Sequence, residues 1–328
     1  MLKGKCIRRK HILGFVLMII LFLGGYIYWD NNRVIIKKCD IAIKDLPDEF
    51  VGYKFLQISD LHGKLFGKNQ TNILKKINSE EYDCILFTGD MNKFETSDDE
   101  SSKSLFDLIS GIKTEKPMFW VDGNTGPFAC ENYDGCYTGD LTEMGLELEK
   151  KGIKVLLYPE AVKKRDDIIW ITPEICKSDI EIFYFGNDEI NNDRYRKICS
   201  YGNKILKWYT LLNENQDVII RVNHYPLQIN MTQKERTDMG YLDYDLSIAG
   251  HYHGGQFRIP FFGALYIPSP TSGRGGYFPK QSEVMGLIDI DGMQQYVSAG
   301  LGASSSVPFL AFRLFNTPEI NLICLTKE

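Results

Sequence analysis

Seven residues of types that bind metal ions stand at the ends of apolar runs along this chain. They are Asp60, His62, Asp90, Asn124, His224, His251 and His253. Imidazole and carboxylate ligands suit borderline divalent cations such as Mn, Fe or Zn. Two such ions, roughly 3.5–4 Å apart, clamp a phosphoryl group for in-line displacement. The residue types together indicate two-metal phosphoester chemistry, although each one alone is also typical of a helix cap or a turn.

The densest of these motifs covers residues 250–256, which read Gly-His-Tyr-His-Gly-Gly-Gln and directly follow the apolar run 246–249. Side chains at positions i and i+2 leave a strand on the same face, so the rings of His251 and His253 are expected to converge on one spot. The flanking glycines let the backbone bend and let other loops approach. Two histidines alone are equally typical of a solvated loop. Four of the five histidines, however, stand where an apolar run gives way to a loop.

Apolar runs that end in these polar turns are interspersed with segments of helical periodicity. The runs cover residues 54–59, 84–88, 118–121, 218–223 and 246–249, and the helical segments cover 69–79 and 101–112. This rhythm of strand, polar turn and helix predicts an α/β layout with a mostly parallel sheet. Ligands of such sheets bind beyond the carboxyl ends of the strands. The elements are therefore expected to bring the polar turns together.

The rest of the chain adds further predicted elements. Helices are expected at 140–151 and 192–213, and strands at 33–43, 155–157, 168–171, 181–185, 284–288, 295–297 and 320–324. From residue 30 onward there is no internal repeat, low-complexity segment or break in composition. We therefore expect one domain over residues 30–328, a length that a two-sheet sandwich tolerates.

The N-terminus has the composition of a membrane-directed segment. Residues 1–10 carry five basic side chains and no acidic one, and residues 12–29 are almost entirely apolar. That run is close to the roughly 20 residues that a bilayer requires. Tyr26, Tyr28 and Trp29 stand at its far end, where interfacial aromatic side chains belong. The pattern predicts a single transmembrane helix.

The flanking charges predict the orientation of this helix. Because positively charged flanks stay in the cytoplasm, we expect a cytoplasmic basic segment at 1–11, an anchor at 12–29, and an extracytoplasmic remainder. One alternative is a cleaved signal peptide, although no small-x-small site precedes Asp30. A second is a twin-arginine export signal at Arg8-Arg9.

The charge of the chain excludes one class of partner. Its 38 basic and 43 acidic residues give a net charge of −5, and without the five basic residues at the N-terminus the balance is 33 against 43, or about −10. An acidic body argues against non-specific nucleic-acid binding and fits a protein that binds cations. No feature indicates an oligomeric state.

The cysteines carry little information about the redox compartment. None of the eight belongs to a C-x-x-C motif. Cys130 and Cys136 lie in a polar, Gly-containing stretch, where they either form a disulfide in an oxidising compartment or remain thiols.

The ordered motifs resemble those of the calcineurin-like metallophosphoesterase superfamily: D-x-H, G-D, G-N-H-[E/D], H and G-H-x-H. The resemblance runs from about Leu46 to the end of the chain. Residues 46–62, 250–256 and 260–263 look like the bacterial membrane-associated branch. That branch is similar to enzymes that hydrolyse phosphodiester or pyrophosphate bonds, including lipid-linked substrates such as UDP-2,3-diacylglucosamine.

The resemblance implies a fold, a ligand set and a reaction. The implied fold is a two-sheet α-β-β-α sandwich flanked by helices. Carried over by motif, Asp60, His62 and His253 would hold one ion, Asn124, His224 and His251 the other, and Asp90 would bridge them. A hydroxide between the two ions, with Mn as the favoured metal, would attack a phosphoester substrate.

One motif departs from the family pattern. Residues 123–126 read Gly-Asn-Thr-Gly, so Thr125 replaces the histidine that usually protonates the leaving oxygen, and the acid that follows it is also missing. General acid catalysis is worth about 10²–10⁴-fold. We therefore expect either a phosphodiesterase that favours good leaving groups, or an impaired, metal-dependent binder of phosphorylated ligands. The presence of all seven ligands favours the enzyme.

Two further features near the last motif concern the substrate. Six aromatic residues either form an apolar rim for an acyl chain or, as is more frequent, pack in the core: Phe257, Phe261, Phe262, Tyr266, Tyr277 and Phe278. Residues 273–276, Gly-Arg-Gly-Gly, are a candidate phosphate contact.

Overall fold

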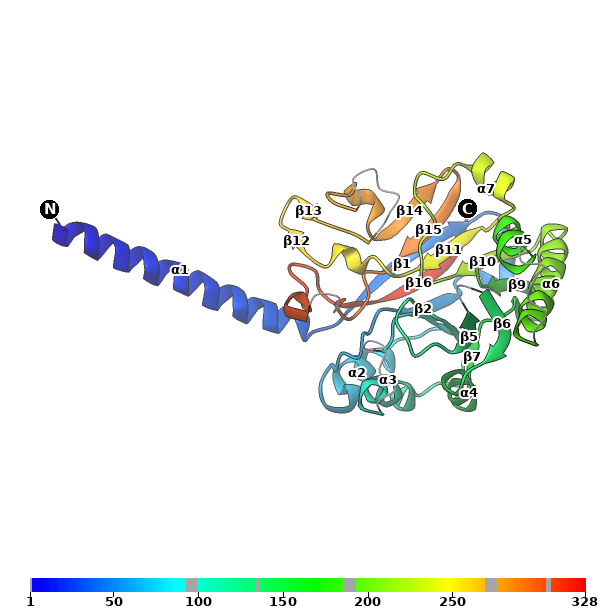
Figure 1. The fold of residues 1–328 in the computed structure, drawn as a ribbon, viewed down its shortest axis with the longest axis horizontal. Helices are drawn as coiled ribbons and strands as arrows, with labels where there is room; N and C mark the ends of the chain where they lie inside the picture. The colour runs from blue at the N-terminus through cyan, green and yellow to red at the C-terminus, as the bar shows by residue number, and fades with distance from the viewer. Residues whose placement is uncertain (1, 93–98, 134–135, 186–192, 269–275, 305–307) are drawn as a thin grey trace.

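One long helix, α1 (Leu2–Asn31), extends away from a body built of two sheets (Figure 1). The computed structural model describes residues 2–92, 99–133, 136–185, 193–268, 276–304 and 308–328. Most of the candidate phosphate contact at 273–276 lies outside the described residues.

The first sheet has six strands in the order β1-β16-β2-β3-β4-β7. Neighbouring strands are parallel except for β16 and β2, which run antiparallel. The strands are β1 (Ile35–Ile43), β2 (Lys54–Ile58), β3 (Cys84–Thr88), β4 (Met118–Val121), β7 (Ile153–Val155) and β16 (Glu319–Lys327). The last strand of the chain therefore lies directly beside β2.

The second sheet also has six strands, in the order β14-β15-β11-β10-β9-β8. They are β8 (Glu160–Lys164), β9 (Asp167–Thr172), β10 (Val218–Val222), β11 (Leu246–Ala249), β14 (Gly286–Ile290) and β15 (Met293–Val297). The four inner strands are parallel, and an antiparallel pair closes each edge. Both sheets are thus mostly parallel, as the strand-and-helix rhythm predicts.

The two sheets share a core of buried apolar side chains. Phe55 and Leu86 of the first sheet and Ile220 and Ile248 of the second are fully buried. Every residue of β3, β10 and β11 is buried. A parallel strand that is covered on both faces is expected to be a continuous apolar run, because neither face meets water. For this reason the uninterrupted runs in the sequence identify the central strands.

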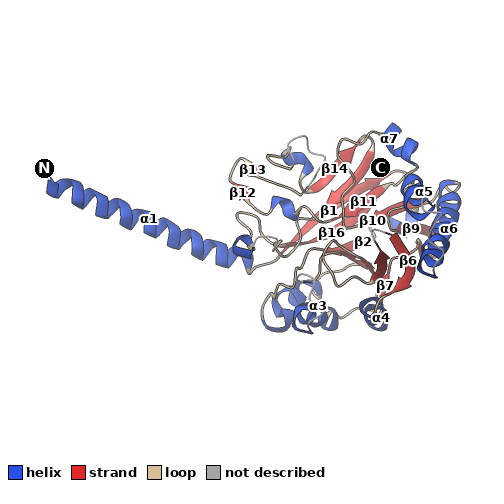
Figure 2. Ribbon diagram, viewed as in Figure 1, coloured by secondary structure: helices blue, strands red, loops and turns tan. Residues whose placement is uncertain are grey.

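Helices cover the outer sides of the two sheets (Figure 2). Beside the first sheet lie α2 (Thr71–Ile77), α3 (Asp99–Gly111) and α4 (Glu143–Lys150); beside the second lie α5 (Lys177–Phe185), α6 (Asp193–Asn213) and α7 (Gln233–Met239). Two small hairpins complete the body: β5 (Cys130–Tyr133) with β6 (Cys136–Leu141), and β12 (Arg258–Ile259) with β13 (Gly263–Ala264). The two-sheet sandwich flanked by helices is confirmed.

The predicted strand at residues 181–185 is wrong, because these residues form the end of α5. The run Glu-Ile-Phe-Tyr-Phe is short and apolar, and such a run fits a buried helix as well as a strand. In the structure α5 packs against α6, and its Ile180 joins the apolar core. The adjacent helix therefore decides the conformation over local β propensity. The helix expected at 140–151 also begins later, since residues 136–141 pair as β6.

The sequence left open whether Cys130 and Cys136 form a disulfide, and the register of the β5–β6 hairpin places them apart. Cys130 pairs with Leu141, whereas Cys136 pairs with Tyr133. Three positions along a strand amount to about 10 Å, and a disulfide requires Cα atoms within about 7 Å. The hairpin therefore keeps Cys130 and Cys136 from bridging each other.

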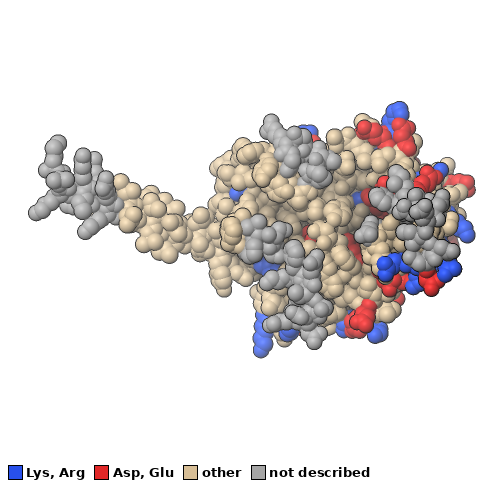
Figure 3. Space-filling view, in the orientation of Figure 1, with Lys and Arg blue, Asp and Glu red and all other residues tan. Residues whose placement is uncertain are grey.

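Helix α1 is apolar and projects from the body. The segment His11–Asn31 is long and apolar enough to cross a membrane, and no charged side chain shows along the part of the projecting helix whose side chains are described (Figure 3). A secretory signal and a membrane anchor share these properties. The structure thus supports a membrane-directed N-terminal helix.

The last turn of α1 is built into the body. The side chain of Asn31 donates to the carbonyl of Arg313 (2.7 Å) and accepts from its N–H (2.8 Å). Next to it, the buried Asp30 pairs with Arg33 (2.6 Å) and accepts from the hydroxyl of Thr317 (2.7 Å). The helix end is therefore held rigidly against the segment that precedes β16.

We expect Asn31→Ala to destabilise the chain by about 1–3 kcal/mol, because it leaves the buried N–H and C=O of Arg313 without partners. Urea unfolding of the full chain in detergent, followed by near-ultraviolet circular dichroism, measures the change. Asn32→Ala is the matched control: its exposed side chain donates to the Tyr28 carbonyl within the same helix, and the expected change is within about 0.5 kcal/mol. Equal effects of the two substitutions would show that α1 is not joined to the body in this way.

Candidate metal centre

The predicted ligands follow the carboxyl ends of β2, β3, β4, β10 and β11, and the chain bends sharply where it leaves these strands. Asp60, His62 and Asp90 all have left-handed backbones, with φ of 52°, 48° and 52°. These bends are locked together: the N–H of Asp60 donates to the Gly89 carbonyl (3.0 Å), and that of His62 to the Asp90 carbonyl (2.9 Å). Non-glycine residues rarely adopt this conformation, and such strain concentrates at functional sites.

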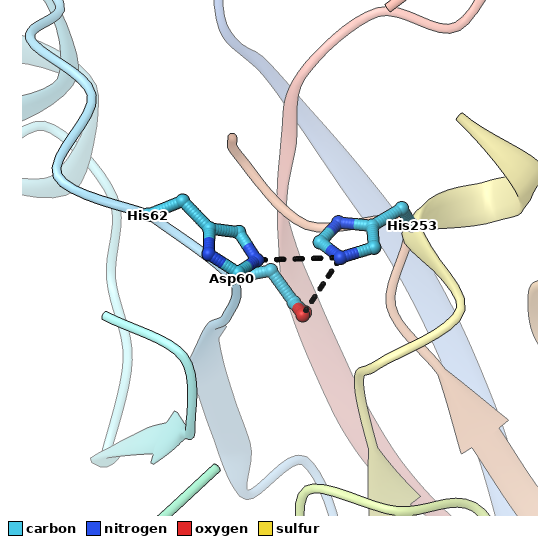
Figure 4. Close-up of side chains that lie close together, drawn as sticks. All are labelled: Asp60, His62 and His253. Carbon is cyan, nitrogen blue, oxygen red and sulfur yellow. Dashed lines mark hydrogen bonds and ion pairs between the residues drawn. The ribbon is translucent and has the colours of Figure 1, made fainter. Parts of the chain in front are cut away.

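Asp60, His62 and His253 form a first buried cluster, with ligand atoms within 4.8 Å of one another (Figure 4). The Nε2 atoms of the two histidines lie 3.3 Å apart, and His253 Nε2 lies 3.8 Å from Asp60 Oδ1. Three lone-pair atoms thus face one point.

Asp60, Asp90 and His224 form a second buried cluster of the same dimensions. Asp90 Oδ2 lies 3.5 Å from His224 Nε2 and also 3.5 Å from His62 Nε2. Asp90 of the second cluster therefore also faces His62 of the first, and Asp60 belongs to both clusters.

The remaining two predicted ligands meet at His224. Its Nε2 lies 3.0 Å from Asn124 Oδ1 and 3.1 Å from His251 Nδ1. The structure therefore brings all seven predicted residues together. It also corrects the expectation that His251 and His253 converge on one spot, since one turns to His224 and the other to His62. Both have positive φ (70° and 50°), so the chain has left strand geometry, and the i, i+2 rule no longer applies.

Glycines permit the close approach of these turns. A Cβ on Gly123 would lie 2.0 Å from Asp90 Oδ1, and one on Gly89 would lie 2.7 Å from His224 Nδ1. A Cβ on Gly250 would lie 2.5 Å from Asp60 Oδ2. The glycines of the sequence motifs thus leave room for the carboxylates and the ring.

Burial sets the protonation of three of the histidines. It lowers the pKa of His62 and of His251 to about 4, and that of His253 well below its ordinary value. These rings are therefore neutral near pH 7, so each retains a nitrogen lone pair that can bind a metal.

The charges of the carboxylates dominate at His224. Burial alone would lower the pKa of His224, but the negative charge of Asp90, and then that of Asp60, raises it to about 9. Burial would raise the pKa of Asp90, yet the opposing effect of His224 and His62 holds it below its usual range. Burial raises the pKa of Asp60 to about 6. The two carboxylates thus stabilise positive charge at the centre, which the proton on His224 supplies in part.

The donor set fits divalent metal ions. His224 donates from Nδ1 to the Thr88 carbonyl (2.9 Å), and its Nε2, which carries a proton in the cationic ring, faces the lone pairs of Asn124 Oδ1 and Asp90 Oδ2. Lone pairs that converge in this way repel unless a positive charge lies among them. A proton meets that need in part, and a metal ion meets it fully. Neutral imidazole and carboxylate ligands match Mn, Fe or Zn.

The sequence did not reveal a second group of residues that supports the centre. The fully buried Arg313 donates to the carbonyls of His253 (3.1 Å), Ala299 (2.7 Å) and Gly302 (2.6 Å). Asn316 also donates to the His253 carbonyl (2.6 Å). These residues hold the loop of a predicted ligand, but they follow no chemical motif, so only the fold reveals them.

A cavity of about 470 Å³ adjoins the centre. It is lined by His62, Asp90 and His251 and by the apolar Phe257 and Leu310, among others.

Thr125 also lines this cavity. Its N–H donates to Asp90 Oδ1 (2.8 Å), and its buried hydroxyl has no hydrogen-bond partner within the described part of the chain. A side chain at position 125 therefore lies beside the ligands, where the family places its proton donor.

Most of the six aromatic residues noted in the sequence are exposed, which contradicts core packing for them. The five exposed ones are Phe261, Phe262, Tyr266, Tyr277 and Phe278. The sixth, Phe257, is partly buried and packs edge-on against Phe312 with ring centres 5.1 Å apart. Tyr266 also lines the cavity, so part of this group reaches the centre.

A two-sheet α/β sandwich with paired Asp/His clusters beyond its strand ends defines a metallophosphoesterase. The chain belongs to the calcineurin-like phosphoesterase family, whose model matches residues 53–255. It is 22% identical over 316 residues to the uncharacterized metallophosphoesterase YkuE of Bacillus subtilis (strain 168). The aligned region covers 92% of this chain and 90% of YkuE.

Two solved structures are similar at low TM-score. One is the phosphopantetheinyl hydrolase PptH of Mycobacterium tuberculosis, with a TM-score of 0.38 and 11% identity over 77% of this chain and 91% of that one. The other is GAP50, the anchor in the inner membrane complex of Plasmodium, with a TM-score of 0.38 and 14% identity over 76% of this chain and 72% of that one.

We expect Gly123→Ala to weaken divalent metal binding by about 10–100-fold, the range seen when a group that orients a ligand is displaced. The new Cβ would collide with Asp90 Oδ1 and push the carboxylate from its place. Metal titration followed by calorimetry measures the affinity. The control is Gly126→Ala, three residues along, where the nearest atom to a new Cβ lies 3.6 Å away. Unchanged binding in Gly123→Ala would contradict the placement of Asp90 at the metals.

Proposed function

We propose that this chain is a two-metal phosphoester hydrolase, acting as a phosphodiesterase on envelope or lipid-linked substrates. The observation that carries the proposal is the pair of buried clusters that share Asp60, in which Asp90 faces a histidine of each cluster, beside a cavity. When bound, the two ions would supply Lewis acidity and a nucleophile at neutral pH.

We propose the ligand assignment that the family motifs imply. Asp60, His62 and His253 would hold one ion, Asn124, His224 and His251 would hold the other, and Asp90 would contact both. The 3.5 Å distances from Asp90 Oδ2 to a histidine of each set support its bridging role. The meeting of Asn124 and His251 at His224 Nε2 supports the second set. Mn is the favoured metal.

Hydrogen bonds support both carboxylates. Asp60 Oδ2 accepts from the Ser59 hydroxyl (2.5 Å), both of its oxygens accept from the N–H of His251 (3.2 and 3.3 Å), and its Oδ1 also faces His253. Asp90 Oδ1 accepts from the N–H of Thr125, while its Oδ2 faces the histidines. These bonds fix the carboxylates before a metal or substrate arrives, which lowers the cost of organising the site.

The threonine at position 125 shapes the reaction. Its hydroxyl does not titrate near neutral pH and cannot replace an imidazolium as general acid. A leaving group that departs as a stable anion needs no proton. The hydrolysis rates of aryl diesters and pyrophosphates should therefore be reduced least by the lack of a general acid. Thr125 also favours a second candidate function, a metal-dependent binder of phosphorylated ligands without turnover.

The location follows from α1. We propose that α1 anchors the chain in the cell membrane and that the body, one domain over residues 30–328, lies outside the cytoplasm. Its apolar, exposed length and the buried hydrogen bonds that join its end to the body support a retained helix. A hydrolase held at a bilayer meets lipid-linked phosphoesters at high local concentration.

We expect the full chain in detergent, loaded with Mn²⁺, to hydrolyse bis-p-nitrophenyl phosphate, and Asp90→Ala to reduce the rate by more than about 100-fold. Loss of the bridging carboxylate removes a ligand from both ions. Asp289→Ala, which removes an exposed carboxylate from β14, serves as the control and should keep full activity. If the chain binds two ions but hydrolyses no phosphoester, the hydrolase proposal is wrong and the metal-dependent binding function remains.

We expect Thr125→His to restore a proton donor. The rate increase should be largest for a substrate with a poor leaving group. We expect the rate of hydrolysis of diphenyl phosphate to rise about tenfold or more, within the 10²–10⁴-fold limit of general acid catalysis. Bis-p-nitrophenyl phosphate should gain less. Thr125→Asn introduces a polar side chain that cannot act as a general acid, and it should not increase the rate of hydrolysis of either ester. A gain that is equal for both esters would rule out proton donation as the missing step.

A further inference from the structure

The hairpin of β12 and β13 carries a strongly exposed aromatic tip. Phe261 has a relative exposure of 111% and Phe262 of 53%, next to the exposed Ile259 and Pro260. Phe261 also has a left-handed backbone, with φ of 66°. A bulky residue with such a backbone conformation is unusual. Exposure of the apolar phenylalanine side chain to water is also unfavourable. The side chain at this tip is thus placed for contact with something apolar.

The base of the hairpin is fastened to the segment that holds α1. The N–H of Arg258 donates to the Leu314 carbonyl (2.9 Å), and the N–H of Leu314 donates to the Gln256 carbonyl (3.1 Å). Leu314 directly follows Arg313, whose backbone is bonded on both sides by Asn31 of α1. The hairpin and the helix are therefore parts of one rigid frame.

The apolar surface is continuous from helix to tip. The ring centre of Tyr26 on α1 lies 5.1 Å from that of Phe315. Phe315 lines a groove of about 380 Å³ together with Ile259, Phe261 and Phe262. Tyr26 belongs to the aromatic end of the apolar helix, the level at which a spanning helix meets the membrane–water boundary.

The surroundings of the hairpin match an apolar partner. Phe309 of the short helix η5 (Pro308–Leu310), which lies beside the end of α1, is 79% exposed (Figure 1). On the face that Figure 3 shows, charged side chains gather at the end of the body away from α1, and few lie near β12 and β13.

We propose that the tip of the β12–β13 hairpin, residues 259–262, inserts into the outer boundary of the same phospholipid bilayer that α1 spans. This inference rests on the membrane anchor of the proposed function. The occupant is the bilayer because the exposed surface continues an exposed apolar helix at the level of its aromatic end. With α1 already in the membrane, so small a patch suffices, since the second contact is intramolecular.

This contact would orient the cavity toward lipid. Phe257 and Tyr266, on either side of the hairpin, both line the cavity at the metal centre. Tyr266 in turn packs on Tyr277, with ring centres 5.1 Å apart, and Phe278 packs on Phe262 of the tip at 6.0 Å. A phosphoester head group in the cavity would then keep its acyl chains in the bilayer under the hairpin, so the substrate class is a membrane phospholipid or glycolipid phosphoester.

The test places a fluorophore on the tip. Full chains of Phe261→Trp and of Leu211→Trp are reconstituted into phosphatidylcholine vesicles whose acyl chains are brominated or not. Leu211 is exposed on α6, at the end of the body away from α1 (Figure 1). After subtraction of the parent signal, we expect bromine to lower the emission of the indole added at 261 about twofold or more, as for a group within the acyl boundary. The indole added at 211 should be unaffected.

The parent chain separates this inference from the anchor on which it rests. Its own Trp29 on α1 should be quenched by brominated lipid whether or not the hairpin inserts. Quenching of Trp29 without quenching at position 261 would overturn the hairpin contact and leave the anchor intact. Emission at 261 that shifts to the blue with protein concentration, and not with bromine, would overturn it in favour of a second copy of the chain. The readout needs no turnover, so failure of the hydrolase proposal leaves it unaffected.

Discussion

The structure depends on two buried carboxylates that face each other across a group of imidazoles. Asp60 and Asp90 have at most 3% of their surface exposed, and unpaired buried charge is costly. The chain meets this cost with bonds from Ser59 and Thr125 and with the cationic form of His224. A metal ion at this place would take over the role of the proton on His224, so the buried clusters suit metal ions.

Much of this arrangement is legible in the sequence, for a simple physical reason. Central parallel strands are continuous apolar runs, and their carboxyl ends meet, so polar turns after the runs at β2, β3, β10 and β11 had to be neighbours. The same logic failed for residues 181–185, where a short apolar run packs as the helix α5 against another helix. It also failed for the direction of His251 and His253, because their left-handed backbones cannot be deduced from spacing.

The supporting residues and the exposed hairpin lay beyond the reach of sequence patterns for a different reason. The Arg313 side chain bonds four carbonyls, three of which, at residues 253, 299 and 302, lie more than ten residues away in the sequence, and no local periodicity encodes such contacts. The aromatic residues near the last motif were expected more often in the core, since large apolar side chains usually lie there. Five of them are exposed, and exposure of that kind is a property of the assembled surface.

Arg313 connects the two halves of the proposed function. Its backbone is bonded on both sides by Asn31 at the end of α1, and its guanidinium bonds the carbonyl of His253. The path from α1 to a proposed metal ligand thus passes through one fully buried side chain. Because a network of that kind allows little relative movement, the direction of α1 fixes the direction in which the metal centre faces. A chain that needed only a tether would be served by a flexible linker. If α1 is the membrane anchor that we propose, this rigid joint would fix the orientation of the cavity relative to the bilayer.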